Sequence, residues 1–249
     1  MTEVTLESKV ALVTGAAKRV GAAIARHLHA AGANVVLHYR NAEKEAVALE
    51  KELNAARAGS AVRVKADLLA PIAPQALIGA AKQRFARLDF LVNNASAFYP
   101  TRVGEIEASH WEELIGSNLR APLFLAQAAA PHLAFGGGAI VNVADIHAER
   151  PLKGYVVYSI AKSGLVALTR SLALELAPTV RVNAVAPGAI AWPEDGQFES
   201  AERARIVATT PLGRTGSAEE VAQAVHFLCT ASYVTGQILA VDGGRSVFL

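Results

Sequence analysis

The sequence has little of what marks a secreted, membrane-spanning or nucleic-acid-binding protein. Its 249 residues include one cysteine, Cys229, so no disulfide can form within the chain, and a reducing, cytoplasmic setting is expected. Aromatic residues make up 6%, too few for a surface on which nucleic-acid bases would stack, and a net charge of +2 is too small to indicate binding to a nucleic-acid backbone. No uncharged apolar run reaches the roughly 18 residues of a membrane span, and the N-terminus "MTEVTLESKV" lacks the apolar segment of a signal peptide. We therefore expect neither nucleic acid nor a membrane as a partner.

The chain is rich in apolar residues, at 52%, and only 18% of it is charged, which favours a packed core over disorder. Short β-branched runs alternate with longer Ala/Leu-rich stretches that are typical of helices. The predicted strands are residues 9–14, 34–39, 61–66, 88–94, 138–144, 180–186 and 236–242. Continuously apolar strands that alternate with helices predict an α/β fold, a doubly wound parallel sheet with helices on both faces. The length fits a single domain over residues 1–249.

One long segment, residues 187–217, shows neither a strand nor a helix pattern. It contains three prolines and four glycines. A loop of this length in a compact domain commonly lies over a functional site. We therefore predict that 187–217 is an irregular loop beside a substrate.

The turn after the first predicted strand has the features of a dinucleotide site. It reads "TGAAKRVG", residues 14–21, and Gly15 and Gly21 would allow a tight turn and a close approach of the backbone to a pyrophosphate. Two glycines alone are a weak signal. Asp67 ends the third strand and "NNAS", residues 93–96, ends the fourth, so polar groups gather at the carboxyl edge where open sheets bind ligands.

The end of the second strand indicates which dinucleotide is bound. Proteins that hold NAD usually place an acidic residue there for the ribose hydroxyls. This sequence reads "LHYRN", with His38, Arg40 and Asn41 and no acid, and Lys18 and Arg19 add positive charge nearby. These groups would bind a 2′-phosphate, so the sequence predicts NADPH.

A second set of residues suits proton transfer. Tyr158 and Lys162 are four positions apart in "YSIAK", which places both on one face of a helix. A lysine ammonium stabilises a phenolate and so makes the phenol a stronger acid. The carboxylate of Asp145 precedes them in "VADIHAERPLKGYVVYSIAK", residues 143–162.

Taken together, "TGAAKRVG", "NNAS", Asn118, "YSIAK" and the Pro-Gly pair at 187–188 resemble the short-chain dehydrogenase/reductase family over nearly the whole chain. The resemblance implies a seven-stranded Rossmann sheet and a homotetramer. It also implies that Tyr158 donates the proton, that Lys162 binds the nicotinamide ribose and lowers the tyrosine pKa, and that Asn118 holds a water in a relay to Lys162.

Two positions depart from the common pattern of that family. Arg19 replaces the middle glycine of the turn, and Asp145 replaces the catalytic serine. A serine hydroxyl can donate to a developing alkoxide, whereas an ionised carboxylate would repel it. A carboxylate suits a substrate that carries N–H donors and a ring nitrogen that becomes basic as hydride arrives.

These departures, with "LHYRN" and "NNASAFYPT", residues 93–101, resemble the pteridine reductase branch of the family. The resemblance implies NADPH-dependent reduction of pterins and of folates. It implies that Phe98 stacks on the pterin and that Arg19 and Ser96 bind cofactor phosphate and pterin edges. In the segment 189–196, Trp192, Glu194 and Asp195 are candidates for the flank of the substrate.

The expected catalytic residues are Asp145, Tyr158, Lys162 and Asn118, and no metal is expected. The expected cofactor-binding residues are Gly15, Lys18, Arg19, Val20, His38, Tyr39, Arg40, Asn41, Asp67, Leu68, Asn94, Ala95, Ser96, Tyr158, Lys162, Pro187, Gly188 and Ile190. The expected substrate-binding residues are Arg19, Ser96, Phe98, Asp145, Tyr158 and Trp192.

Two other functions use the same scaffold. A carbonyl or 3-oxoacyl reductase would fit the fold, but Asp145 in place of serine speaks against it. A non-catalytic dinucleotide-binding sensor would be expected to lose Tyr158 or Lys162, and both are present.

Overall fold

The computed structural model describes residues 5–190, 192 and 199–248. Within them, seven strands form one sheet in the order β3-β2-β1-β4-β5-β6-β7, and every neighbouring pair is parallel. The strands are β1 (Val10–Val13), β2 (Asn34–Tyr39), β3 (Ala61–Lys65), β4 (Phe90–Asn93), β5 (Ala139–Val143), β6 (Arg181–Pro187) and β7 (Ile238–Val241). The predicted parallel sheet is confirmed, and each predicted strand matches an observed one to within two residues.

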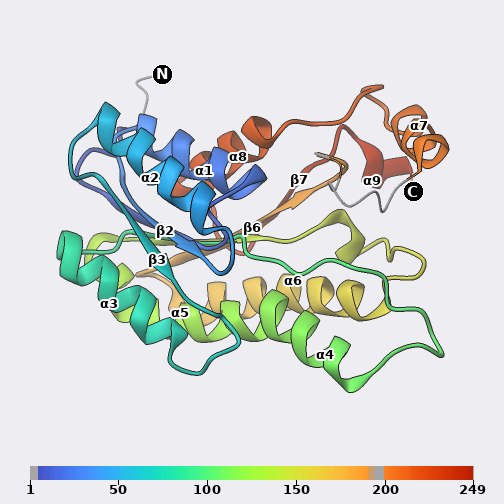
Figure 1. The fold of residues 1–249 in the computed structure, drawn as a ribbon, viewed down its shortest axis with the longest axis horizontal. Coiled ribbons are helices and arrows are strands. Elements are labelled where there is room, and N and C mark those ends of the chain that lie inside the picture. Colours follow the sequence, from blue (N-terminus) through green and yellow to red (C-terminus); the bar gives the residue numbers. More distant parts are fainter. Residues whose placement is uncertain (1–4, 191, 193–198, 249) are drawn as a thin grey trace.

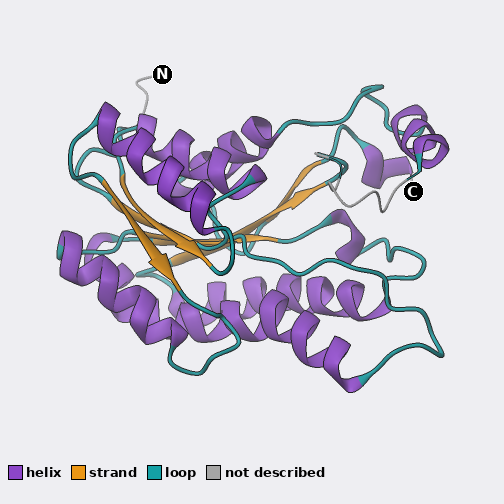
Figure 2. Cartoon of the chain, in the orientation of Figure 1, coloured by secondary structure: helices purple, strands orange, loops and turns teal. Residues whose placement is uncertain are grey.

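Helices cover both faces of the sheet (Figures 1 and 2). One layer contains α1 (Arg19–Ala30), α2 (Glu43–Ala56) and α8 (Ala218–Thr230), and the other contains α3 (Ala73–Phe85), α4 (Ala108–Ile115), α5 (Ala121–Leu133) and α6 (Val156–Leu176). Ile24, Leu28 and Val225 belong to the apolar cluster of the first layer, and Leu77 and Leu125 to that of the second. The inner strands β1, β4 and β5 are buried from both sides and have no face for water, which explains their apolar sequences, whereas the edge strand β3 is partly exposed and carries Arg63 and Lys65.

The topology determines where a ligand can bind. The chain runs from β1 outward to β3 and then returns to β4, which pairs with the other edge of β1. The loops after β1 and β4 therefore leave the sheet toward opposite faces, and a crevice forms between them at the carboxyl ends of the strands.

The prediction of an irregular loop over 187–217 is wrong for residues 200–208, which form α7 (Ser200–Ala208). This helix has nine residues, and Ile206 is its buried residue. The prolines and glycines of the segment lie outside it, so composition taken over the whole segment hides the helix. A last short helix, α9 (Arg245–Phe248), follows β7.

The alanine-rich stretch between 105 and 133 is also interrupted. A turn of π-helix, Gly116–Arg120, separates α4 from α5. Such turns insert an extra residue and often occur at functional sites. Among the described residues, no helix is long and apolar enough to cross a membrane.

Candidate functional site

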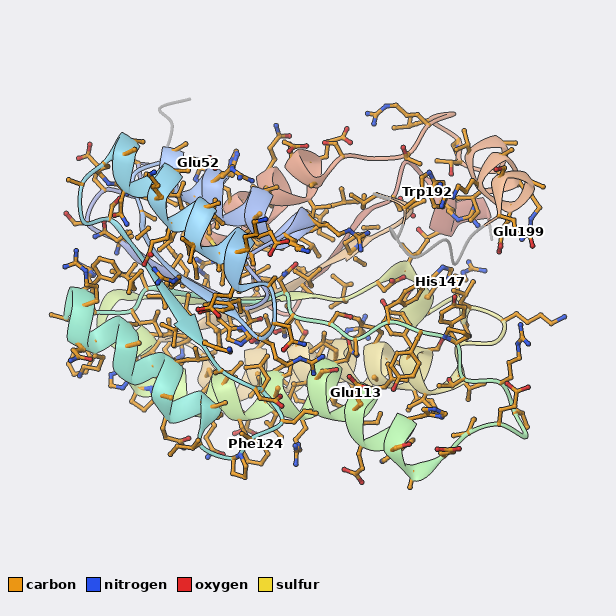
Figure 3. All side chains as sticks on the ribbon, in the orientation of Figure 1. Glu52, Glu113, Phe124, His147, Trp192 and Glu199 are labelled. Carbon is orange, nitrogen blue, oxygen red and sulfur yellow. The ribbon has the colours of Figure 1, made fainter. Side chains whose placement is uncertain are left out.

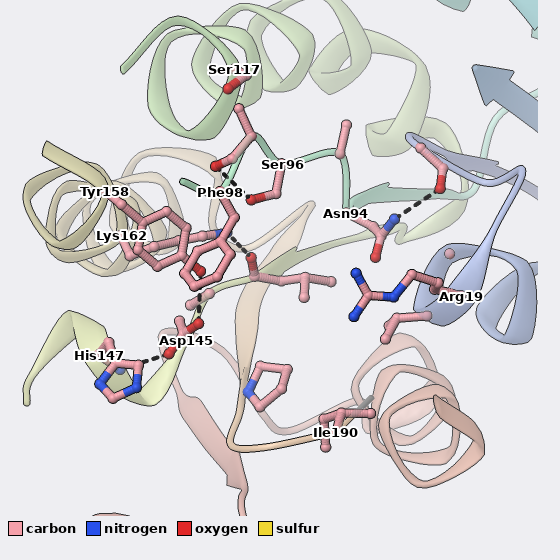
Figure 4. Close-up of a pocket in the computed structure, with 18 of the residues that line it drawn as sticks. Arg19, Asn94, Ser96, Phe98, Ser117, Asp145, His147, Tyr158, Lys162 and Ile190 are labelled. Atoms are coloured by element: carbon pink, nitrogen blue, oxygen red, sulfur yellow. Dashed lines mark hydrogen bonds between the residues drawn. The ribbon is translucent and has the colours of Figure 1, made fainter. Parts of the chain in front are cut away.

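A cavity of about 520 Å³ opens at the carboxyl ends of the strands, at the crevice between β1 and β4 (Figure 4). Most of the residues predicted for the site line it. They are Gly15, Lys18, Arg19, Val20, His38, Arg40, Asp67, Leu68, Asn94, Ala95, Ser96, Phe98, Asp145, Tyr158, Lys162, Pro187, Gly188, Ile190 and Trp192. Tyr39, Asn41 and Asn118 do not line it: Tyr39 packs in a small apolar cluster and Asn41 is exposed on the surface.

The first turn forms the cradle that a pyrophosphate needs. Gly15 has φ +61°, and a Cβ on Gly21 would lie 2.2 Å from the carbonyl oxygen of Gly15. The Asn94 side chain, at the end of β4, donates to the carbonyls of Thr14 (2.9 Å) and Gly15 (3.1 Å) and so fixes the turn. Only glycine fits at position 21, which leaves backbone N–H groups at the start of α1 accessible to an anion.

Arg19 keeps the backbone geometry of the glycine that it replaces. Its φ is +51°, in the left-handed region that side chains rarely adopt. A non-glycine residue there costs about 1 kcal/mol. In return, the turn carries a guanidinium into the cavity, where Figure 4 shows it beside Asn94.

His38 braces the turn and does not supply a positive charge. Its Nδ1 accepts from the N–H of Gly15 at 3.1 Å, and its Nε2 lies 3.1 Å from the carbonyl of Ala66, to which it donates. Burial lowers the pKa of His38, so the ring is neutral at pH 7. His38 lies in the cavity wall, and its role toward a cofactor stays a prediction.

At the end of the cavity where the adenosine of a cofactor is expected, two cations are held in ion pairs. Lys18 Nζ lies 2.7 Å from Glu45, and Arg40 lies 3.7 Å from Glu113. Both pairs are about half exposed, so each contributes little to stability and can exchange its carboxylate for a phosphate. Asp67 accepts from the N–H of Leu69 at 3.0 Å, which fixes the loop after β3.

At the other end of the cavity, Asp145 and Tyr158 form a hydrogen-bonded pair (Figure 4). The Tyr158 hydroxyl donates to Oδ2 of Asp145 at 2.7 Å, and the N–H of His147 donates to Oδ1 at 2.8 Å. Asp145 follows β5 and starts a short 3-10 turn, Ile146–Ala148, whereas Tyr158 lies in the first turn of α6. Both carboxylate oxygens are thus fixed, one of them on the phenol.

Lys162 lies one turn further along α6 and is fully enclosed. Its ammonium donates to the carbonyl of Val143 at 2.8 Å and lies 5.7 Å from the centre of the Tyr158 ring. Burial lowers the pKa of Lys162 to about 8, although the charge of Asp145 opposes this shift. The amine therefore titrates close to the neutral range.

The expectation that Lys162 lowers the pKa of Tyr158 is not met. Burial, and then the charge of Asp145, raise the pKa of Tyr158 well above its ordinary value. Asp145 is in direct contact with the phenol, whereas the Lys162 ammonium donates to the backbone carbonyl of Val143. The hydroxyl consequently holds its proton firmly at neutral pH.

Asn118 lies in the π-helical turn, beneath the floor of the cavity. Its amide nitrogen donates to the carbonyls of Ala97 and Leu114, both at 3.0 Å, and its oxygen accepts from Ser96 at 2.7 Å. The amide oxygen and nitrogen both have protein partners, so the side chain fixes the loop after β4. The water that the sequence argument assigned to Asn118 stays a prediction.

Phe98 presents an aromatic surface beside the proton-transfer pair. Its ring stacks on Tyr155 with centres 4.7 Å apart and meets Tyr158 edge-on at 4.8 Å. Phe98 is half-buried and lines the cavity, as predicted for a stacking residue. A flat heterocycle placed here would touch Phe98 and the Asp145–Tyr158 pair together.

The mouth of the cavity includes residues that the sequence argument missed. Trp192 lines the cavity, and Glu194 and Asp195 lie outside the described residues. Glu202 and Arg205 of α7 and Arg245 of α9 also line it, as does Leu152. His147 lines it too and is labelled in Figure 3. Sequence spacing gives no signal for α7 and α9, because tertiary packing alone brings these helices to the site.

Comparison with known proteins agrees with this geometry. Residues 15–246 match the family described as enoyl-(acyl carrier protein) reductase. The chain is 41% identical to pteridine reductase 1 of Leishmania tarentolae, over 96% of each chain. It is also 36% identical to a 3-oxoacyl-(acyl-carrier-protein) reductase of Synechocystis sp., over 98% of this chain and 99% of the relative.

Proposed function

The chain belongs to the short-chain dehydrogenase/reductase family of oxidoreductases, and from this premise we propose that it is an NADPH-dependent pteridine reductase. The reaction would convert a dihydropterin, or dihydrofolate, to the tetrahydro form. The observation that carries the proposal is the Asp145 carboxylate in the position of the family's serine, 2.7 Å from the Tyr158 hydroxyl and beside the Phe98 ring.

NADPH fits the residues of the cavity. The glycine cradle at Gly15 and Gly21 has room for a pyrophosphate but not for a side chain. Arg40 and Lys18 would bind the 2′-phosphate in place of their present carboxylate partners. When bound, NADPH supplies the hydride.

Residues of this chain hold the proton and transfer it to the substrate. Hydride addition to the pterin ring leaves a basic ring nitrogen, which needs one proton. The Tyr158 hydroxyl holds a proton at Oη, and Asp145 shares that proton through Oδ2. Because of this hydrogen bond, a proton taken up by Asp145 allows Tyr158 to pass its own to the substrate. The Lys162 ammonium offsets the negative charge of this unit.

A 3-oxoacyl reductase is the second candidate, and the Synechocystis relative favours it. That reaction develops negative charge on a ketone oxygen, which has to lie within hydrogen-bonding distance of Tyr158. The Asp145 carboxylate, already in contact with that hydroxyl, would oppose it. A non-catalytic sensor is the weakest candidate, because binding alone does not need a proton donor such as the Tyr158 hydroxyl, which is held on Asp145.

The test is NADPH oxidation with dihydrobiopterin, dihydrofolate and a β-keto thioester, for the parent enzyme and for Asp145→Ser and Asp145→Asn. We expect pterin reduction by the parent, a loss of at least about 100-fold in both variants, and NADPH binding close to that of the parent. If Asp145→Ser reduced the pterin as fast as the parent, the carbonyl reductase would become the better proposal.

We also propose that the enzyme is a homotetramer in the cytoplasm. Phe124 of α5 and Ile160 and Leu174 of α6 expose apolar side chains, which contact with another copy would cover. Light scattering coupled to size exclusion would test this, because a particle of 26.1 kDa would contradict it.

A further inference from the structure

The mouth of the cavity carries two arginines that the reaction as described does not use. Arg205 projects from α7 and Arg245 from α9, and both line the cavity that also holds Asp145 and Tyr158. In Figure 1, α7 and α9 lie next to each other beyond the end of β7. Figure 3 shows Trp192 near them, across from His147.

Arg245 is a buried cation without a carboxylate partner among the residues that the structure describes. It is 8% exposed and donates to the carbonyl of Ile206 at 3.1 Å and to the hydroxyl of Thr209 at 2.6 Å. Burial lowers the pKa of Arg245, and the charge of Arg205 lowers it further, although Asp242 opposes the shift. An anion between the two arginines would offset this repulsion.

Arg205 is the accessible member of the pair. It is exposed, and within the described ranges its side chain makes no hydrogen bond or ion pair that a ligand would have to displace. Glu202, one turn earlier on α7, lines the cavity with it, so the three charged side chains through which α7 and α9 line the cavity sum to one positive charge. The cofactor's phosphates would bind elsewhere, at the first turn and at Arg40.

We propose that Arg205, supported by Arg245, is a specificity-determining anion subsite that binds the carboxylate at the end of the substrate's side chain. This inference rests on the proposed function. A pterin that stacks on Phe98 would extend its ring substituent past His147 and Trp192 toward α7. The substrate class that meets a cation there is a pterin with a p-aminobenzoylglutamate tail, a dihydrofolate, as distinct from a pterin with a neutral side chain.

The experiment compares kcat/KM for dihydrofolate and for dihydrobiopterin, which has no carboxylate, in the parent, Arg205→Ala, Arg205→Glu and Arg205→Lys. Arg84→Ala, which removes an exposed arginine of α3 outside the cavity, is the matched control. We expect the dihydrofolate-to-dihydrobiopterin ratio to fall about 5-fold in Arg205→Ala and at least about 10-fold in Arg205→Glu. Arg205→Lys should recover most of the ratio, and Arg84→Ala should leave it unchanged.

Salt provides a second measurement. In the parent, the KM for dihydrofolate should rise between 20 mM and 500 mM NaCl, because an exposed charge contact is screened, and this rise should shrink in Arg205→Ala. If both substrates are reduced but their ratio and its salt dependence are the same in Arg205→Glu as in the parent, the inference is overturned while the proposed function stands.

A binding measurement distinguishes a failure of the anion subsite from a failure of the proposed function. Calorimetry with p-aminobenzoylglutamate and the NADP⁺-loaded enzyme reports on the subsite without turnover. If the parent reduces neither pterin, the proposed function fails. Binding that Arg205→Glu weakens would then still support the anion subsite, and absent or unaffected binding would overturn it.

Discussion

Replacing Lys162 by methionine is expected to stabilise the protein at neutral pH while it abolishes turnover. Lys162 is 2% exposed, and its ammonium has the carbonyl of Val143 as its hydrogen-bond partner. A pKa lowered from 10.5 to about 8 means that keeping this group charged inside the fold costs about 3 kcal/mol at pH 7. Losing the hydrogen bond to Val143 costs about 1 kcal/mol. The net gain for Lys162→Met should therefore be about 2 kcal/mol.

The dependence on pH identifies the cause. Below pH 8 the lysine is protonated in the folded and the unfolded chain, so the cost is constant. Between about pH 8 and 10.5 the unfolded chain binds this proton and the folded chain does not, so stability rises with pH. The parent should gain about 2 kcal/mol from this group between pH 7 and 9.5, and Lys162→Met should lack that gain.

The assay is urea unfolding of the cofactor-free protein at pH 7 and 9.5, at one fixed protein concentration. Lys51→Met, which removes an exposed lysine of α2, is the control. Tyr158 and Cys229, whose pKa values burial raises, contribute alike to both proteins, and the difference between parent and variant cancels them. Identical changes with pH in the parent and in Lys162→Met would refute the reasoning.

Three further outcomes are expected. Tyr158→Phe should lower kcat for a dihydropterin by two to four orders of magnitude, with the Kd of NADPH, from fluorescence titration, nearly unchanged; a variant with most of the parent rate would exclude Tyr158 as the donor. Phe98→Ala should raise the pterin KM by a factor that corresponds to about 1–3 kcal/mol of lost binding free energy if stacking dominates binding, and an unaltered KM would mean that the pterin ring does not stack on Phe98. Arg40→Asp should weaken NADPH binding by about 2 kcal/mol and spare NADH; equal affinities of the parent for the two cofactors, measured by calorimetry, would contradict the assignment.

The strands and the cofactor turn could be read from the sequence because local rules determine them. A strand buried on both faces must be apolar throughout, and a turn with φ +61° at Gly15 and a backbone contact at Gly21 must have glycine there. Arg19 shows the limit of such rules, since the backbone keeps a positive φ without the glycine.

Features that depend on tertiary packing could not be read in this way. Ile206 is the buried residue of α7, and one buried position does not produce the repeated apolar spacing that indicates a helix. The neutral state of His38 follows from its burial, which only the fold produces. The rise in the pKa of Tyr158 likewise comes first from burial and then from Asp145, and spacing along the chain gives neither the burial nor the 2.7 Å contact.

The proposed function gives the side chain at position 145 the main part in the choice of substrate. A ketone oxygen that accepts from Tyr158 would lie about 4 Å from the Asp145 carboxylate, and two unit charges at that distance repel by about 4 kcal/mol near a protein surface. This corresponds to almost three powers of ten in rate. The carboxylate cannot turn away, because the N–H of His147 fixes its second oxygen. A pterin reverses the sign of the interaction, because its ring presents N–H donors to the carboxylate and gains a proton where a ketone would gain negative charge. Under the proposed function, aspartate in place of serine at position 145 therefore disfavours carbonyl reduction and favours reduction of a nitrogen heterocycle.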